Sequence, residues 1–465
     1  MKSALEAMQP LFQKPSPVVP LRGAHLDLKG MPPTSGRLLE LPALLAAARY
    51  NVVLVEWEDA FPWTTDIRFR SSTAYAPETV RRFAEAASAH GLELIPLVQC
   101  LGHMETPLSV PGNEHLREAA DDPTTLNPLA PGARDLVVGM VDDVLSLLPA
   151  TRYFHLGGDE ARRLGTHPDT AAYIAKHGKG ALYLQHVGPI LDRLNARGVR
   201  PVLWHDMMVE WDDDALRALA PRCDLMVWGY NGHPDTTPHH FNSRHIRRFR
   251  DLGLTLWGAT AFKGADGLTA DFPDFGRRQA SAAGWAEVSQ RFGMKGVVAT
   301  GWGRYSALSA PCETLESALD ALVSVGVVLH DGQPPSGGAE TVAEALDRLG
   351  EGARFRECRE AMHLLDAVRR NGWQECRQLL ELHALHSRFP PRGHPSLAMP
   401  ALRYAGNIMK TGQEAEEKVY RALAGRVDKI WIDEYLHTRL APLRGAYAGV
   451  VKDWMTPAEA PGRRC

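Results

Sequence analysis

Residues 133–157 read ARDLVVGMVDDVLSLLPATRYFHLG. The segment 133–148 places apolar side chains at helical spacing, and the segment 152–157 is a short apolar run of the kind that forms a buried strand. This helix-then-strand unit recurs along the chain to about residue 330. A chain that alternates helices with buried strands builds a parallel sheet whose faces are covered by the helices.

Eight apolar runs have the length and composition of such strands. They are GAHLDL (23–28), NVVLVEW (51–57), LELIPLV (92–98), RYFHLG (152–157), RPVLWH (200–205), DLMVWGY (224–230), LTLWGA (254–259) and GVVATGW (296–302). Eight is the number of strands that closes a parallel sheet into a (β/α)8 barrel, and closure removes both exposed sheet edges. An open doubly wound sheet is the alternative, but no GxGxxG motif follows the first strand. We therefore predict an α/β chain built on a (β/α)8 TIM barrel.

The chain changes character after the barrel. PPSGG (334–338) has the composition of a linker. Three segments with helical periodicity follow it, at 344–370, 373–389 and 414–440. We predict an N-terminal extension at 1–20, a catalytic barrel at 21–333 and a C-terminal helical region at 339–465. The helical region would pack either on the barrel or on a second copy of the chain, which would make a homodimer.

The composition excludes several classes of protein. The net charge is −3 and no long basic run occurs, so we expect no nucleic-acid partner. No apolar stretch approaches the roughly 20 residues that span a bilayer, and the first residues lack the apolar core of a signal peptide. The six cysteines are scattered and no two have CxxC spacing. Scattered thiols predict a reducing, cytoplasmic location.

The predicted carboxyl ends of the strands are rich in acidic, histidine and aromatic side chains. In a barrel of this kind the active site lies at those ends. The candidates are Asp27, Glu58, His103, His155, Asp159, Glu160, Trp204, Asp206, Trp228, Tyr230, Trp302, Tyr305 and, at the start of the following helix, Glu313. Tryptophan rings that pack on sugar C–H faces, beside carboxylates that accept from hydroxyls, are typical of a carbohydrate pocket. For each tryptophan taken alone, core packing is the alternative.

Two acidic residues stand side by side after two glycines in HLGGDEA (155–161). Neighbours on a regular strand point to opposite faces, so Asp159 and Glu160 share one pocket only if the backbone leaves β geometry. Gly157 and Gly158 permit that departure because they lack a Cβ. Two carboxylates in one site raise the pKa of one of them, which leaves one protonated donor and one anion. The pair therefore predicts acid–base chemistry.

The acidic pair could also serve three roles that involve no proton transfer. Acidic residues in the first turn of a helix interact favourably with its dipole. A magnesium site would use further carboxylates, but no third one stands at ligand spacing. His155 with Asp159 could bind a transition metal, although their spacing is not that of a known metal motif. We predict no metal and no cofactor.

Seven motifs of the chain resemble those of glycoside hydrolase family 20, the β-N-acetylhexosaminidases, and most closely the hexosaminidase D branch. They are RGAHLDLKG (22–30), VEWEDAFPW (55–63), GHME (102–105), HLGGDE (155–160), WHDM (204–207), AFKGAD (261–266) and TGWGRY (300–305). These motifs cover all but one of the predicted strand ends. The resemblance implies an exo-acting enzyme that releases terminal N-acetylglucosamine or N-acetylgalactosamine from an oligosaccharide by substrate-assisted, retaining hydrolysis.

The resemblance also implies roles for the site residues. Glu160 would be the protonated general acid, and Asp159 would be the anion that holds the acetamido N–H. Tyr230 would donate to the acetamido oxygen, while His103, with Glu58 behind it, would tune the pKa of Glu160. Trp302, with Trp204 or Trp228, would form the walls around the acetamido group or the sugar ring.

Two stretches depart from the family pattern. Well-known members have an arginine just after the first strand for the sugar hydroxyls, where this chain offers Asp27 or Lys29. They also have W-x-E after the eighth strand, whereas Glu313 comes later here. The choice between gluco and galacto substrates therefore stays open. Two other functions remain alternatives: a carbohydrate-binding or scaffolding protein on an inactive barrel, and a glycosidase with a covalent carboxylate nucleophile.

Overall fold

Eight parallel strands close into a barrel, as the sequence predicts. The computed structural model describes residues 8–390 and 392–455. Around the barrel the strand order is β1-β10-β9-β8-β7-β6-β3-β2, and β1 pairs with both β2 and β10. The bounds are β1 Leu21–Asp27, β2 Val52–Glu56, β3 Glu93–Leu97, β6 Tyr153–His155, β7 Arg200–Trp204, β8 Asp224–Trp228, β9 Thr255–Lys263 and β10 Gly296–Gly301. The (β/α)8 fold is therefore confirmed.

Helices follow the strands and cover the outside of the barrel. Their bounds are α2 Ser35–Ala47, α3 Pro77–Ala89, α4 Glu105–Leu108, α5 Ala133–Leu147, α6 Pro168–His177, α7 Lys179–Ala196, α8 Asp213–Leu219, α9 Ser243–Asp251, α10 Phe275–Phe292 and α11 Leu319–Asp331. Short 3-10 turns lie at Gln9–Leu11, Glu58–Ala60, Ile67–Phe69, Glu114–Leu116, Asp206–Met208 and Glu316–Ala318. A larger apolar layer of side chains fills the space between strands and helices.

The barrel interior is packed with side chains and is not a pore. Its buried apolar residues are Val52, Leu54, Ile95, Leu97, Val202, Trp204, Met226, Trp257, Ala259 and Val298. The layer fills the barrel because alternate residues of each strand point inward. Its upper edge, at the carboxyl ends of the strands, meets the polar residues described below.

A small antiparallel hairpin departs from the predicted pattern. It is formed by β4 Arg117–Ala119 and β5 Asp122–Leu126, which lie between β3 and α5. Its strands are too short and too polar to show a clear alternation of apolar and polar residues, so the sequence did not indicate it. The hairpin matters for the site because Asp122 and Thr124 line the main cavity.

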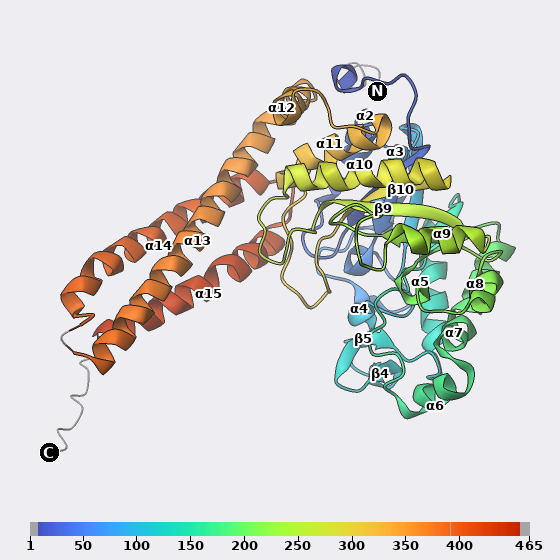
Figure 1. Ribbon diagram of the computed structural model, residues 1–465, viewed down its shortest axis with the longest axis horizontal. Helices are drawn as coiled ribbons and strands as arrows, with labels where there is room; N and C mark the ends of the chain where they lie inside the picture. Colours follow the sequence, from blue (N-terminus) through green and yellow to red (C-terminus); the bar gives the residue numbers. More distant parts are fainter. Residues whose placement is uncertain (1–7, 391, 456–465) are drawn as a thin grey trace.

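The C-terminal region is helical, with different boundaries from those predicted. It consists of α12 Gly338–Arg348, α13 Gly352–Arg388, α14 Pro395–Leu423 and α15 Lys429–Met455. The first predicted segment begins in α12 and, after a break at residues 349–351, continues with the second segment in one helix, α13. The third segment is divided by a turn around Gly425, whose φ is +74°. Helices α13, α14 and α15 pack together and project from the barrel as an elongated arm (Figure 1).

The arm is joined to the barrel by buried polar contacts. Asp271, in the loop after β9, accepts hydrogen bonds from Tyr435, Arg439 and Arg369, at 2.6, 2.9 and 2.5 Å. The backbone of the α14–α15 turn also pairs with the segment before α2 through a bridge between Pro33 and Val427. Of the two predicted packing arrangements, the base of the helical region thus adopts the one on the barrel.

Candidate active site

A cavity of about 630 Å³ opens at the carboxyl ends of the barrel strands. It is lined by Lys29, His103, Glu105, Asp122, Thr124, Asp159, Glu160, Arg162, Arg163, Trp228, Tyr230, Asn231, Gly264, Ala265, Trp302, Arg304, Tyr305 and Ser306. The cavity is large enough for a small ligand, and it combines aromatic walls with converging charged groups. Asp159 and Glu160 both line it, so the adjacent carboxylates share one cavity, as predicted.

The backbone leaves strand geometry immediately before the pair. Gly157 and Gly158, which follow β6, have φ values of +58° and +80°, and Glu160 itself has a φ of +44°. A Cβ on Gly157 would lie 1.8 Å from Oε1 of Gln99, and one on Gly158 would lie 2.2 Å from the hydroxyl of Tyr183. Glycine is therefore required at both positions, by conformation and by space.

Asp159 is the deeper of the two acids. Its residue is 5% exposed, and its Oδ1 has no hydrogen-bond partner among the described residues. Burial raises the pKa of Asp159 to about 8, and the carboxylates of Asp206 and Glu160 add to this effect, while His103 opposes it. A buried oxygen without a partner needs an explanation, and a bound ligand is one.

Glu160 lies nearer the opening and is held as an anion. Its Oε1 is 2.6 Å from Nη2 of Arg162, its Oε2 is 3.5 Å from Nε2 of His103, and its backbone N–H donates to Asp206. Hydrogen bonding from His103, followed by that from Arg162, lowers the pKa of Glu160 to about 2. The raised pKa of Asp159 and the lowered pKa of Glu160 are opposite in direction to the roles that the resemblance implies, a protonated Glu160 and an anionic Asp159.

His103 lies between the two acids. Its Nε2 is 3.7 Å from Oδ2 of Asp159, and its Nδ1 is 3.8 Å from Oε1 of Glu105. Although burial disfavours a charged imidazole, these carboxylates raise the pKa of His103 well above its usual value. The acid on the far side of the ring is therefore Glu105. Glu58, predicted for that place, accepts from Thr106 at 3.3 Å instead.

Aromatic side chains form one wall of the cavity. Trp228 and Tyr230 stack with ring centroids 5.3 Å apart, and Tyr230 lies 6.2 Å from Trp302. Asp206 orients this wall because it accepts from Nε1 of Trp228 at 3.2 Å. Trp204 is fully buried beneath Trp302 and does not line the cavity. Tyr305 lines it and is 39% exposed.

Besides Trp204, five predicted residues lie outside the cavity lining: Asp27, Glu58, His155, Asp206 and Glu313. Asp27 accepts from the backbone N–H of Gly303 at 2.7 Å, and Glu313 accepts from that of Gly264 at 2.6 Å. His155 accepts from the N–H of Gly157 at 3.0 Å, and burial lowers its pKa to about 3. Asp27, Glu313 and His155 therefore each hold a loop that carries cavity residues.

Several cavity residues were not among the predicted site residues. Lys29 lines the cavity in place of Asp27, with its Nζ 3.1 Å from Oδ1 of Asp27 and 3.0 Å from Oε1 of Glu56. Arg162 and Arg163 follow the acidic pair after one alanine, so their proximity in sequence was a usable signal. The remaining additions are Glu105, Asp122, Thr124, Asn231, Gly264, Ala265, Arg304 and Ser306.

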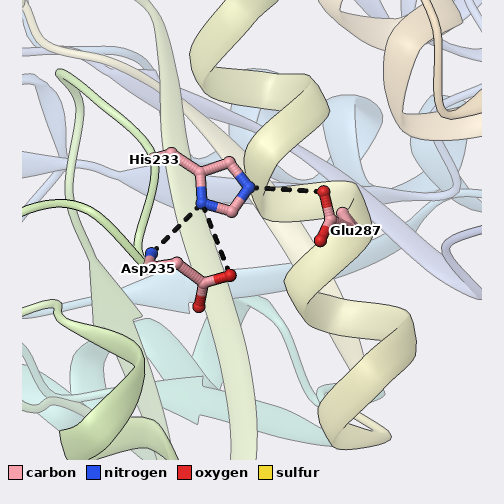
Figure 2. A group of neighbouring side chains, drawn as sticks. All are labelled: His233, Asp235 and Glu287. Atoms are coloured by element: carbon pink, nitrogen blue, oxygen red, sulfur yellow. Dashed lines mark hydrogen bonds and ion pairs between the residues drawn. The ribbon is translucent and has the colours of Figure 1, made fainter.

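One group outside the cavity has the residue types of a metal site. His233 lies between Asp235 and Glu287, where the loop after β8 meets α10 (Figure 2). Its Nδ1 faces Asp235 and its Nε2 faces Glu287, so a single ion could not use both ring nitrogens. Arg291 also pairs with Asp235 at 2.5 Å and with Glu287 at 3.8 Å. The group is therefore a compensated surface ion-pair network.

Within residues 8–390 and 392–455, no helix combines the length and the hydropathy that a membrane span requires.

Comparisons with known proteins agree with the geometry. Residues 41–241 match the family described as glycosyl hydrolase family 20, catalytic domain. Hexosaminidase D of Bos taurus is 33% identical over 322 residues, which cover 67% of this chain and 92% of that protein. Hexosaminidase D of Homo sapiens is 33% identical over 315 residues, and the chain spans only 64% of that protein's length.

Solved structures share the fold. A chitobiase of Flavobacterium johnsoniae aligns with a TM-score of 0.54 at 14% identity, over 97% of this chain and 77% of that one. An N-acetyl-β-hexosaminidase of Streptomyces plicatus aligns with a TM-score of 0.51 at 17% identity, over 72% of this chain and 69% of that one. At these identities the likeness concerns the architecture alone.

Proposed function

This chain belongs to glycoside hydrolase family 20, and we propose that it is an exo-acting β-N-acetylhexosaminidase. It releases terminal N-acetylglucosamine or N-acetylgalactosamine from the β-glycosides of an oligosaccharide by substrate-assisted, retaining hydrolysis. The observation that carries the proposal is the pair Asp159–Glu160, which lines one cavity and whose two pKa values are shifted in opposite directions. A binding protein would gain nothing from two adjacent acids of this kind.

Asp159 and Glu160 divide the chemistry between them. The acetamido N–H of the sugar donates to Asp159, whose Oδ1 is without a partner in the described chain. The acetamido oxygen forms a bond to the anomeric carbon while the bond to the leaving oxygen breaks, and Glu160 gives its proton to that oxygen. Water then attacks the anomeric carbon, Glu160 takes a proton from it, and the acetamido group is restored. The developing positive charge is stabilised by anionic Asp159.

Substrate binding has to reverse the order of the two pKa values. In the free enzyme the pKa of Asp159 is raised and that of Glu160 is lowered, which favours a proton on Asp159, whereas catalysis needs it on Glu160. The two arrangements carry the same total charge, so the pair does not need to gain a proton from solvent. An acetamido N–H that donates to Asp159 favours its ionised form, and a new anion beside Glu160 raises the pKa of that acid.

The aromatic residues complete the proposed subsite. Trp228 and Trp302 provide apolar surface for the acetamido methyl group or the sugar ring, and Tyr230 is placed between them. We assign the acetamido oxygen to the hydroxyl of Tyr230. Lys29, rather than Asp27, is the cationic group available to the sugar hydroxyls from this part of the chain.

A comparison of three substrates tests the function. The nitrophenyl β-glycosides of N-acetylglucosamine and N-acetylgalactosamine should be hydrolysed, and the plain glucoside should not, because it lacks the attacking amide. Efficient hydrolysis of the glucoside would favour the alternative with a covalent carboxylate nucleophile. No hydrolysis of any of the three would favour a sugar-binding protein on an inactive barrel. A thiazoline mimic of the cyclic intermediate should inhibit the enzyme strongly.

The remaining proposals concern the setting of the enzyme. We propose a division into residues 1–20, the barrel at 21–333 and the helical region at 339–465, and action without metal or cofactor. A cytoplasmic location is consistent with the cysteines at 100, 223, 312, 358 and 376, which are all free and buried. A homodimer through the arm would cover exposed Trp373, Leu380 and Tyr404, and sedimentation analysis would test it.

A further inference from the structure

We propose that the group released with the glycosidic oxygen is anionic, and that Arg162 and Arg163 bind its carboxylate. The inference rests on the proposed function and names the class of aglycone on which that function acts. It follows from the position of the two arginines relative to Glu160, from their limited ion pairing, and from the charge that Glu160 must lose before it can act as an acid.

The position of Glu160 defines the side of the cavity that the leaving group occupies. A general acid must lie within hydrogen-bonding distance of the oxygen it protonates, so the aglycone lies beside Glu160. The side chain of Glu160 is 29% exposed, whereas that of Asp159 is 7% exposed. The acetamido group therefore lies on the deep side, at Asp159, and the aglycone extends toward the opening.

The opening is flanked by two arginines on the loop that follows the acidic pair. Both line the cavity, together with Asp122 and Thr124 of β5. Arg162 donates to Oε1 of Glu160 at 2.6 Å. Among the described residues, the ion pairs of Arg163 are all long, at 3.7 Å to Asp121 and 3.6 Å to Asp122. Their guanidinium groups are accessible, since the side chains are 76% and 42% exposed.

Catalysis removes the ion-pair partner of Arg162. In the free enzyme the charge of Arg162 is compensated by ionised Glu160, its single ion-pair partner within the described chain. In the reactive complex Glu160 must be protonated, so this compensation is lost while the aglycone covers the guanidinium. A neutral aglycone leaves the cation without an anion, whereas a carboxylate on the aglycone replaces the one that Glu160 provided.

An anionic aglycone also favours the protonated form of Glu160, which is the form that acts as the general acid. The hydrogen bond from Arg162 is one of the causes that keep the pKa of Glu160 low. An arginine that is engaged by the aglycone no longer stabilises the ionised form of Glu160, so the proton moves to Glu160 more readily. The same contact therefore favours binding and the protonation state that the chemistry requires.

Two disaccharides that differ in one group test the proposal. In both, N-acetylglucosamine is β1→4-linked, in one to glucose and in the other to glucuronic acid, so the leaving hydroxyl is the same. Release of N-acetylglucosamine gives kcat/KM for each. We expect the glucuronic acid disaccharide to be preferred by about five- to tenfold at low ionic strength, and the preference to shrink as salt is added.

Substitution of the two arginines tests whether they cause the preference for the glucuronic acid disaccharide. Arg162→Gln and Arg163→Gln should each reduce the ratio of the two kcat/KM values, and the double variant should bring it close to one. Arg193→Gln is the matched control, because Arg193 is 42% exposed, pairs with Asp142 and does not line the cavity. The control variant should retain the wild-type ratio.

The other outcomes separate this inference from the function on which it rests. Equal cleavage of the two disaccharides, or a preference for the glucose compound, would overturn the anionic aglycone while leaving the hexosaminidase intact. A preference that survives in the double arginine variant would overturn the assignment to Arg162 and Arg163. Cleavage of the nitrophenyl N-acetylglucosaminide but of neither disaccharide would also overturn the inference. An absence of activity on every N-acetylhexosaminide would overturn the function itself.

Discussion

Two buried aspartates, at the mouth of the barrel and at its junction with the arm, differ in their hydrogen bonding. Asp271, at the junction, is 2% exposed, and both of its oxygens accept hydrogen bonds, from Tyr435, Arg439 and Arg369. Asp159, at the mouth, is 5% exposed and has one oxygen without a partner in the described chain. Asp271, whose oxygens both accept hydrogen bonds, joins two parts of the protein. Asp159, which has an oxygen without a partner in the described chain, is available to a substrate.

We therefore expect Asp271 to contribute to the stability of the fold and Asp159 to contribute to the chemical step. Substitutions at the junction should weaken the fold and leave the chemical step intact, and substitutions at the mouth should do the reverse. A buried charge that loses its partners destabilises a protein strongly. A carboxylate that has few partners in the free enzyme contributes little to the fold, so its loss is felt when substrate is bound.

The largest effect is expected for Glu160→Gln. Without the proton donor, kcat on substrates with poor leaving groups should fall by about 10²- to 10⁴-fold, the usual contribution of a general acid. Substrates with nitrophenolate leaving groups should be affected less, because they need little protonation. Inhibitor binding and the midpoint of urea unfolding should stay close to the wild-type values. Undiminished turnover of an alkyl N-acetylglucosaminide would show that Glu160 is not the acid.

Asp271→Asn should be the most destabilising of these substitutions. It leaves the buried Arg439 and the partly buried Arg369 without a countercharge, which should lower the free energy of unfolding by about 3–5 kcal/mol. Urea denaturation followed by circular dichroism measures this loss. The control is Glu416→Gln, which breaks the exposed pair with Arg444 inside the arm and should cost less than about 1 kcal/mol. Equal losses in the two variants would remove the distinction between junction and surface.

Asp159→Asn should slow turnover by about 10²- to 10³-fold and change its pH dependence. In the wild type the pKa of Asp159 is raised to about 8, so the pair keeps one proton up to that pH and kcat/KM should decline above it. Asparagine cannot hold this proton, and the pKa of Glu160 is lowered to about 2. The alkaline limb of the residual kcat/KM should therefore move to lower pH. A limb that stays in place would mean that Asp159 does not carry the proton.

The smallest effect is expected where the two regions meet. Glu434 of α15 accepts two hydrogen bonds of 2.7 Å from Arg304, which lines the active-site cavity and also donates to the carbonyl of Ser309. Glu434→Gln should loosen the loop after β10 and raise KM by about two- to fivefold with little change in kcat, because Glu434 is partly exposed. Glu434→Asp should restore part of the loss. A fall in kcat equal to that in kcat/KM would contradict this positioning role.

The sequence predicts the barrel well because each of its strands carries its own signal. Runs such as NVVLVEW and RPVLWH are apolar over a strand length and are separated by amphipathic helices, so periodicity alone identifies them. The β4–β5 hairpin lacks that signal. The merging of two segments into α13 also escaped prediction, because Gly372 interrupts the helical pattern although it packs closely against Leu443 in the arm.

The sequence predicts only those parts of the site whose residues lie close together along the chain. The paired acids after two glycines are recognisable because the chemistry and the backbone requirement lie within four residues. The choice of Lys29 over Asp27 as a cavity residue was not accessible, because β1 ends at Asp27 and the alternation of a strand no longer fixes the direction of the Lys29 side chain. Likewise, the contact of His103 with Glu105 depends on how a loop folds back, with His103 at a φ of +53°.

The pairing of β1 with β10 has a consequence for the order of events at the ribosome. The barrel cannot close until Gly301 has left the exit tunnel, because β1 pairs with β10, the last barrel strand to be synthesised. The loop after β10 is then fixed by a residue of α15, more than a hundred positions further on. A nascent chain therefore carries the two proposed catalytic acids long before it has a complete pocket around them.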